Sequence, residues 1–219
     1  MKTLFIEAKY KGKVKLPIKL VKQLPKTIGL FAAVQFIDSL KDIKKQLEKS
    51  DKRVKLFKTK HTKYPGQLLG CSIEQFSGVD AFLYIGDGLF HPKALVMKNN
   101  KPVYVYNPLN KSVKTITRRD IDRLLKKQKG AYLRFLESKE IGVLISIKPG
   151  QNQLKRALKL KEAYPDKNFY FLVFDTVDFS QLENFPFIEC FINTACPRIG
   201  LDDSSKIKKP ILNIGDIHS

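Results

Sequence analysis

The sequence contains few cysteines and no long apolar run, and these two shortages exclude several classes of protein. Three cysteines occur in 219 residues, and an odd number in a chain of this length argues against a disulfide framework. No window approaches the roughly 18 uninterrupted apolar residues of a membrane helix. Residues 1–7 carry a charge too early for a signal-peptide core, with no small-residue cleavage site. The sequence therefore predicts a cytoplasmic protein without a membrane segment.

Acidic residues are also scarce, since 21 Asp and Glu stand against 41 Lys and Arg, for a net charge of +20. Such a surface favours nucleic acid, ribosome-associated partners or an acidic protein. The alternative is a lysine-rich surface that is merely solvated, because the basic residues are spread along the chain. No stretch shows the basic and aromatic pattern of an RNA-recognition motif. Charge alone therefore leaves nucleic-acid binding as one alternative.

Apolar strands alternate with amphipathic helices along the chain, and the series runs twice. This pattern predicts an α/β protein made of two doubly wound parallel-sheet (Rossmann-like) units. We expect the boundary near residue 116, with domains 1–116 and 117–219, and find no fixed-period repeat. The expected strands are 2–7, 27–36, 54–57, 81–85, 103–106, 141–147, 169–174 and 187–192. The expected helices are 17–24, 38–50, 90–97, 118–138 (with Ile121, Leu124, Leu125 and Leu133 facing inward) and 151–163, with a short helix or turn at 177–183.

Two of the three cysteines lie in predicted loops and the third in a predicted strand. Cys190 falls within an apolar run and is expected to be a small buried hydrophobe. Cys71 and Cys196 stand beside Gly and Pro, which favours a ligand role more than Cys190 does. Cys196 also follows a strand, where open α/β sheets place ligand chemistry. Because no CxxC spacing is present, the residues alone still favour core or surface thiols over metal ligands.

Three more segments are candidates for binding. Asp87 lies in a Gly-x-Gly turn that lacks the Lys-[Ser/Thr] of a phosphate loop, so a tight turn is favoured, with His91 at the following helix start. The turn 148–151 opens a predicted helix, where either anion contact or simple capping is expected. Arg198 can pair with a carboxylate of a ligand. Residues 202 and 203, both Asp, can instead cap the next segment or pair with Arg198.

Four motifs resemble one known family, and they occur in the family's order. Asn193–Asp203 (NTACPRIGLDD) resembles the third cysteine motif of archaeal diphthamide synthase, the 2-(3-amino-3-carboxypropyl)histidine synthase. Pro65–Cys71 (PGQLLGC) resembles the family's second cysteine motif. Tyr84–Pro92 (YIGDGLFHP) and Lys148–Gln151 (KPGQ) also resemble that family. The resemblance covers nearly the whole chain.

The resemblance implies a fold, a cofactor and a reaction. Members have three similar α/β domains, and each gives one cysteine to a [4Fe-4S] cluster whose remaining iron binds S-adenosylmethionine. A 3-amino-3-carboxypropyl radical formed from that substrate attacks a histidine of elongation factor 2, and full-length members form dimers. Here Cys71 and Cys196 would be metal ligands. The residues implied to contact S-adenosylmethionine or to line its cavity are Lys148, Gly150, Gln151, Arg198, Asp87 and His91.

The chain departs from the family pattern, because it begins with the family's second domain and its two units correspond to the second and third. We therefore expect a separate chain to supply the first domain and its cysteine, with the enzyme inactive without it. Two alternatives are a non-catalytic partner subunit and a degenerate relative with a changed role. Cys190 is a poor substitute ligand because its strand position points to the interior. A hypothesis from another class is a non-catalytic basic protein that recognises the translation factor or RNA.

Overall fold

The computed structural model describes residues 4, 6–70 and 74–217. The chain divides into two compact units, Met1–Asp122 and Arg123–Ser219. The division falls inside helix α4 (Arg118–Glu137), whereas the sequence pattern suggested a boundary near residue 116. In the part of the chain that the structure describes, no helix combines the length and the apolar character that crossing a bilayer requires.

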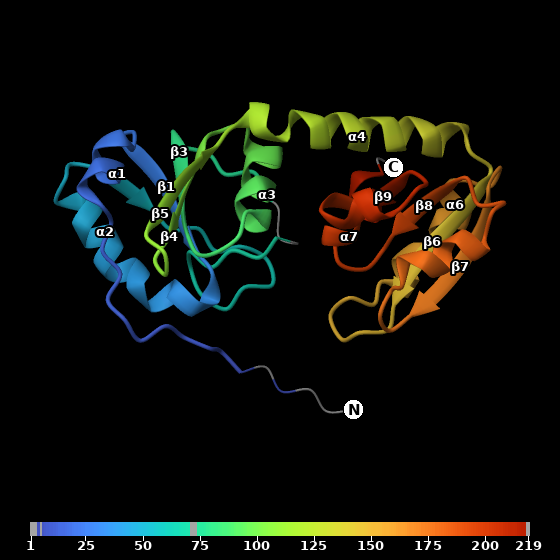
Figure 1. The fold of residues 1–219 in the computed structure, drawn as a ribbon, viewed down its shortest axis with the longest axis horizontal. Helices are drawn as coiled ribbons and strands as arrows, with labels where there is room; N and C mark the ends of the chain where they lie inside the picture. Colours follow the sequence, from blue (N-terminus) through green and yellow to red (C-terminus); the bar gives the residue numbers. More distant parts are fainter. Residues whose placement is uncertain (1–3, 5, 71–73, 218–219) are drawn as a thin grey trace. The chain divides into compact units, whose positions relative to one another are not determined.

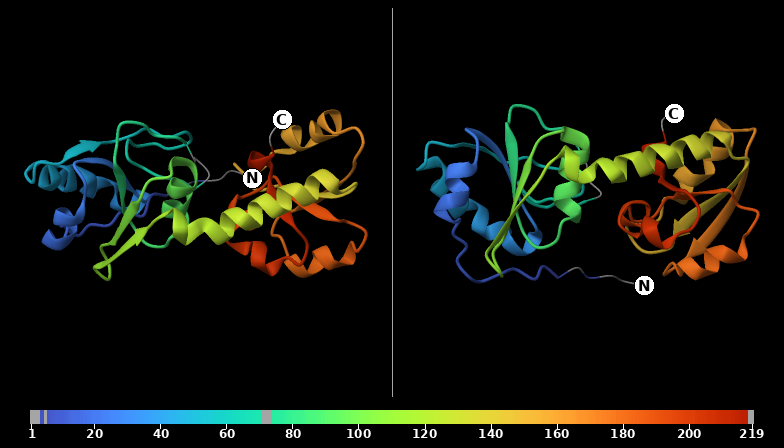
Figure 2. Two further views of the ribbon diagram at one scale, coloured as in Figure 1. Left: turned by 90° about the horizontal axis from the view of Figure 1, so that it is seen from above. Right: turned by 45° about the horizontal axis from the view of Figure 1, so that its top comes forward.

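The first unit contains a five-stranded sheet in the order β2-β1-β3-β4-β5. Strands β1 to β4 are parallel, and β5 pairs antiparallel with β4 in a hairpin. Both faces of the sheet are covered, with α1 and α2 on one side and α3 on the other (Figure 1, Figure 2). The strands are β1 (Thr27–Ala32), β2 (Arg53–Lys55), β3 (Ala81–Ile85), β4 (Val103–Asn107) and β5 (Ser112–Ile116). The helices are α1 (Ile18–Gln23), η1 (Val34–Ser39), α2 (Leu40–Glu48) and α3 (Phe90–Asn99).

Apolar residues on both faces of β1 and β3 form the core of the first unit. Leu20 of α1 and Ile43 of α2 are buried against Leu30 of β1. On the opposite face, the rings of Phe31 and Phe76 lie 5.2 Å apart and belong to an aromatic cluster. Residues buried on both faces of a strand produce the continuous apolar runs that the sequence shows.

The second unit contains a four-stranded, wholly parallel sheet in the order β7-β6-β8-β9. Phe135 of α4 is buried on one face, together with residues of α5 and α6, while Phe191 and Ile199 are buried on the other. The strands are β6 (Glu140–Ser146), β7 (Asn168–Phe174), β8 (Cys190–Asn193) and β9 (Ile211–Asn213). The remaining helices are α5 (Leu154–Leu158), α6 (Leu160–Ala163), η2 (Phe179–Asn184), α7 (Arg198–Leu201), η3 (Asp203–Lys206) and η4 (Ile214–Asp216). The predicted doubly wound α/β class is confirmed.

Several predicted elements were wrong in extent or kind. In the segment expected as a first strand, residues 4, 6 and 7 form no strand, and the Leu4 and Ile6 side chains are exposed. Leu133 was expected to face inward but is half exposed, because Ala131 and Phe135 occupy the buried face of α4. The strand expected over 27–36 ends at 32, where η1 follows. The helix expected from 151 begins only at 154 and breaks into α5 and α6.

Candidate functional site

The loop that carries Cys196 starts at the carboxyl end of β8, as the sequence pattern indicated. The side chain of Cys196 is partly exposed, whereas the strand residues before it are buried. Thr194 closes the end of the strand by donating from both its amide and its hydroxyl group to the Leu144 carbonyl oxygen, at 3.0 and 2.8 Å. The thiol is thus presented on a loop whose first residues are fixed to β6.

Two buried asparagines hold the backbone around Cys196. Asn193 Nδ2 donates to the Cys196 carbonyl oxygen at 2.8 Å and to Asn213 Oδ1 at 2.7 Å. Asn193 Oδ1 accepts from the Ala195 amide at 3.1 Å, and Asn213 Nδ2 donates to the Pro197 carbonyl oxygen at 3.1 Å. Asn193 and Asn213 are registered partners at the ends of β8 and β9. Because these groups are buried and mutually bonded, they fix the loop more rigidly than surface contacts would.

Two cationic side chains lie at the same edge of this sheet. Arg198 begins α7 just after Cys196, and its guanidinium pairs with Asp202 at 3.3 Å. Lys148 follows β6, the neighbour of β8, and its Nζ donates to Thr176 Oγ1 at 3.2 Å. Gly150 has a φ of 78°, a left-handed conformation that glycine adopts without strain. The carboxyl ends of adjacent parallel strands therefore bring the 148–151 turn and the Cys196 loop to one edge.

Cys71 lies outside the residues that the structure describes, but the loop that leads to it is anchored. Gln67 forms a parallel bridge with Ala32 at the end of β1. The Gln67 side chain accepts from the Lys63 amide at 2.9 Å, and the Leu68 amide donates to the Ala32 carbonyl oxygen at 3.0 Å. This segment is therefore held at the carboxyl edge of the first sheet, as far as Gly70.

Asp87 and His91 lie at the same edge of the first sheet, after β3. Asp87 Oδ1 accepts from Asn107 Nδ2 and from the Gly88 amide, each at 2.8 Å. Tyr84 Oη and His91 Nδ1 lie 3.0 Å apart, which fixes the orientation of the imidazole. Burial, with a contribution from the Asp87 charge, raises the pKa of the Tyr84 hydroxyl, so this hydroxyl stays protonated at neutral pH.

Known proteins resemble this chain over most of its length. The family model for diphthamide synthesis proteins matches residues 1–218. The chain belongs to the diphthamide synthesis protein family. It is 33% identical over 198 residues to the 2-(3-amino-3-carboxypropyl)histidine synthase of Pyrococcus horikoshii, covering 88% of this chain and 56% of that protein. It is 37% identical over 152 residues to the synthase of Methanocaldococcus jannaschii, and that match covers 67% of this chain and 44% of that protein.

A solved structure of this family has the same fold. The crystal structure of Dph2 from Pyrococcus horikoshii with a 4Fe-4S cluster superposes with a TM-score of 0.76 at 30% identity. The match covers 91% of this chain and 58% of that chain. The present chain thus spans about half the length of these family members, from 44% to 58%.

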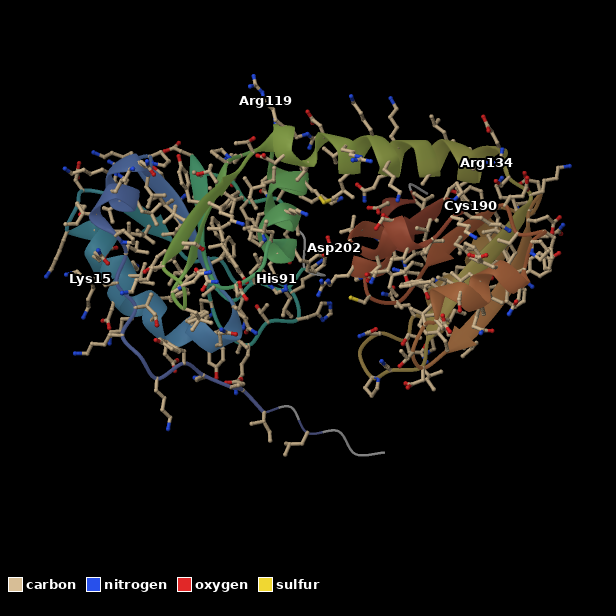
Figure 3. All side chains as sticks on the ribbon, in the orientation of Figure 1. Lys15, His91, Arg119, Arg134, Cys190 and Asp202 are labelled. Carbon is tan, nitrogen blue, oxygen red and sulfur yellow. The ribbon has the colours of Figure 1, made fainter. Side chains whose placement is uncertain are left out.

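The two described cysteines of this family member differ in their capacity to bind iron. Burial raises the pKa of the Cys190 thiol to about 12, and the side chain is fully buried in β8. A thiol of that pKa is not a thiolate at neutral pH, and thiolates are the ligands of iron–sulfur clusters. Cys196, by contrast, is partly exposed on a fixed loop and fits a cluster ligand. The position of Cys190 in β8 agrees with the expectation that it is a core residue (Figure 3).

No third ligand is close to Cys196 within the part of the chain that the structure describes. There, no three His, Cys, Asp or Glu side chains are arranged so that they can hold a metal ion. The candidates gather in two places: Asp87 and His91 at the edge of the first sheet, and the 148–151 turn with Cys196 and Arg198 at the edge of the second. Each unit therefore presents one part of the motif set of the diphthamide synthesis family.

The sequence interpretation of this family member missed the residues that support the loops. Asn193 was noted only as the first residue of a motif, and Asn213 was not considered. A recognisable pattern existed, since both β8 (CFIN) and β9 (ILN) are apolar runs that end in Asn. Tyr84 was assigned to a buried strand, but its bond to His91 depends on the strand–turn–helix geometry and has no sequence pattern.

Gly70 offers a test of how the Cys71 motif is positioned. A Cβ at position 70 would lie 1.9 Å from Cε1 of Phe90, so Gly70→Ala must displace either the loop or the first residue of α3. We expect Gly70→Ala to destabilise the first unit by about 1–3 kcal/mol, as overpacking does. The measurement is urea unfolding followed by circular dichroism.

Two further variants separate this clash from a general effect of replacing glycine. Gly215→Ala is the matched control, because a Cβ there meets nothing within 4 Å, and it is expected to be nearly neutral. Adding Phe90→Leu to Gly70→Ala should recover part of the loss. Equal stability of the Gly70→Ala and Gly215→Ala proteins would contradict the close contact.

Proposed function

We propose that this chain acts in the first step of diphthamide biosynthesis, as part of a [4Fe-4S] 3-amino-3-carboxypropyl transferase. The observation that carries the proposal is Cys196, a partly exposed thiol on a loop fixed by buried hydrogen bonds at a sheet edge. The 4Fe-4S cluster named for the Pyrococcus horikoshii Dph2 structure supports the choice of cofactor. The synthase names of the relatives support the choice of reaction.

Cys71 and Cys196 supply two thiolate ligands in this proposal. When bound, the cluster would supply the electron that breaks a carbon–sulfur bond of S-adenosylmethionine, whose sulfur leaves in the thioether 5′-methylthioadenosine. The 3-amino-3-carboxypropyl radical would then add to the imidazole of a histidine of elongation factor 2, and the adduct would lose one proton and return one electron. The fixed backbone of the Cys196 loop would keep the thiolate in place when the cluster changes charge. Cys190 takes no part, because its side chain is enclosed in the core of the second unit and does not face the loop.

Lys148, Gly150, Gln151 and Arg198 are proposed to bind the carboxylate of the methionine part of S-adenosylmethionine. Lys148 and Arg198 follow adjacent parallel strands, which supports the proposal, and Lys148 would leave Thr176 to meet the same anion as Arg198. Arg198 would exchange its pairing with Asp202 for a bidentate bond to the substrate. Asp87 and His91 are proposed to line the substrate cavity from the first unit, and the Tyr84 contact would orient the His91 ring.

The third cluster ligand is proposed to come from outside residues 1–219. The experiment below tests the specific proposal that a separate polypeptide supplies it. The eukaryotic relatives are named as subunit 1, for example the human protein at 27% identity over 189 residues, which supports a multi-subunit enzyme. We also propose a dimeric assembly. A cytoplasmic location is supported by the free thiols of Cys190 and Cys196.

Anaerobic iron and sulfide reconstitution tests the proposal. The chain is reconstituted alone and together with a candidate polypeptide that carries the third cysteine motif, and iron, sulfide and visible absorbance are measured. We expect a four-iron cluster only when both polypeptides are present. That complex should then cleave S-adenosylmethionine and label elongation factor 2.

The outcome that rejects the proposal is equally specific. If neither the chain alone nor any mixture binds iron above the level of a protein without cysteine ligands, the transferase role is wrong. A four-iron cluster on the chain alone would instead reject the need for a ligand from outside residues 1–219.

A further inference from the structure

Helix α4 presents a basic face that the proposed reaction does not use. Arg123, Lys126, Lys127 and Gly130 follow the spacing i, i+3, i+4 and i+7, so they lie on one side of the helix. All four positions are exposed, while Ala131 and the residues on its side of the helix pack toward the sheet of the second unit. We call these four positions the basic face. Figure 3 shows nitrogen-tipped side chains that extend from α4 away from that sheet.

The cations of the basic face are not neutralised by neighbouring carboxylates. Among the residues that the structure describes, no carboxylate lies within 4.0 Å of the charged atoms of Arg123, Lys126 or Lys127. Asp122 stands one turn before Lys126 but is not paired with it. Arg134, one turn after Gly130, differs because it pairs with Glu189 at 3.5 Å. Three positive charges within five consecutive positions therefore repel one another without internal compensation.

Gly130 is a second, independent feature of the basic face. Glycine in the interior of an exposed helix costs about 1 kcal/mol relative to alanine, and its lack of a side chain allows another molecule to approach the helix backbone closely. A Cβ at position 130 would meet no atom of the described residues within 4 Å, so packing within this part of the chain does not require the glycine. Its position one turn after Lys126 and Lys127 leaves a bare patch of helix backbone beside these cations, which a partner can approach.

The chemistry of this face suits phosphate better than protein. Protein interfaces depend on buried aromatic or aliphatic anchors and are depleted in lysine. The four positions of the basic face carry no apolar or aromatic side chain. Binding to a nucleic-acid backbone needs only cations at suitable spacing, and it gains from counterion release.

We propose that the basic face of α4 binds the phosphate backbone of structured RNA. RNA is preferred to DNA because the proposed substrate is a translation factor, which works on ribosomal RNA, and in that respect the inference rests on the proposed function. A phosphate would lie over Gly130, next to Lys126 and Lys127 one turn before it, and Arg123 would meet a neighbouring phosphate of the same backbone. Such contacts fix position and orientation without reading base sequence.

Fluorescence anisotropy with a labelled 20-base-pair RNA duplex tests this binding across a series of KCl concentrations. The whole iron-free chain is used, so failure of cluster assembly does not affect the result. We expect the triple variant Arg123→Gln, Lys126→Gln, Lys127→Gln to bind about tenfold or more weakly. Its plot of log affinity against log salt should be shallower by about 2–3, since each lost phosphate contact removes nearly one unit of slope.

A matched control removes the same charge from another helix face. Lys41, Lys45 and Lys49 are exposed at i, i+4 and i+8 along α2 and its C-terminal end, and the triple change to Gln should weaken binding less than twofold. Equal losses in the two triple variants would mean that only the net charge matters and would overturn the proposal. Absence of binding by the unchanged chain, or tighter binding to a DNA duplex of the same sequence, would also overturn it.

Gly130→Leu provides a test that does not change the charge. We expect its Tm to rise by roughly 2–4 °C, because leucine is a better helix former, while its RNA affinity falls severalfold as the side chain blocks the close approach. A rise in Tm with unchanged RNA affinity would refute the role of Gly130. If labelled poly-glutamate, and not RNA, loses affinity in the α4 triple variant, the partner is an acidic protein and the RNA proposal is wrong.

Discussion

Cys196→Ser is expected to remove most of the iron that the reconstituted protein binds, whereas Cys190→Ala should leave the iron content unchanged. Cluster irons are held by thiolates, and a serine hydroxyl is a poor replacement for that soft ligand. Cys196 is partly exposed on a fixed loop, while Cys190 is enclosed in β8 with a thiol pKa of about 12. The measurement is iron and sulfide content per protein, with absorbance near the cluster band, in the presence of the partner polypeptide.

The two variants form a matched pair, because each removes one thiol and neither adds charge. Cys71→Ser should behave like Cys196→Ser if both thiols are ligands. Brief alkylation of the native iron-free chain should modify Cys196 and spare Cys190, since alkylation needs an accessible thiolate. If the Cys190→Ala protein loses its iron and the Cys196→Ser protein keeps it, then Cys190 is the ligand and Cys196 is not, and the site described above is wrong.

Asn193→Ala is the second substitution with a large expected effect. It removes two donated hydrogen bonds and one accepted bond. The Ala195 amide and Asn213 Oδ1 would then be buried without a partner, at about 1–3 kcal/mol each. We expect a loss of about 3 kcal/mol in the free energy of unfolding of the second unit, together with reduced iron binding. The loss of stability is measured by urea unfolding, with hydrogen exchange of peptides from β6 and β8 as the signal.

Asn184→Ala is the control for that substitution. Asn184 is exposed, and its Nδ2 donates only to Gln181 Oε1, at 2.9 Å, so its loss should change stability by less than about 0.5 kcal/mol. If the Asn193→Ala and Asn184→Ala proteins unfold at the same urea concentration, the buried network does not stabilise the loop as described.

The sequence allowed the central strands and long helices to be predicted because their residues repeat a strong pattern. Ala81–Ile85 is buried on both faces, so its apolar run was unambiguous. Two of the edge strands, β5 and β9, were missed for the opposite reason. β5 (SVKTI) is largely exposed and carries a lysine, and β9 (ILN) has 3 residues. Edge strands depend on pairing with a neighbour, and a short run shows too few residues to reveal a period.

The features of the candidate site that could be predicted are likewise those formed by residues close together in the sequence. The motif around Cys196 could be recognised because its residues are contiguous. The Asn213 contact joins residues 20 positions apart and becomes visible only when the β8–β9 register is known. Position 151 was taken as a helix start, but the Pro-Gly turn continues to the Asn152 side chain, which accepts from the Leu154 amide at 3.0 Å.

The bond between Asn193 and Asn213 also has a consequence for the order of events during synthesis on the ribosome. The Cys196 loop emerges before β9, yet its backbone carbonyls are bonded by side chains that include one from β9. The loop therefore cannot reach its final geometry until residue 213 has left the exit tunnel. Iron delivered to the nascent chain before that moment would meet an unformed loop, so we expect the proposed cluster to assemble only after residue 213 has emerged.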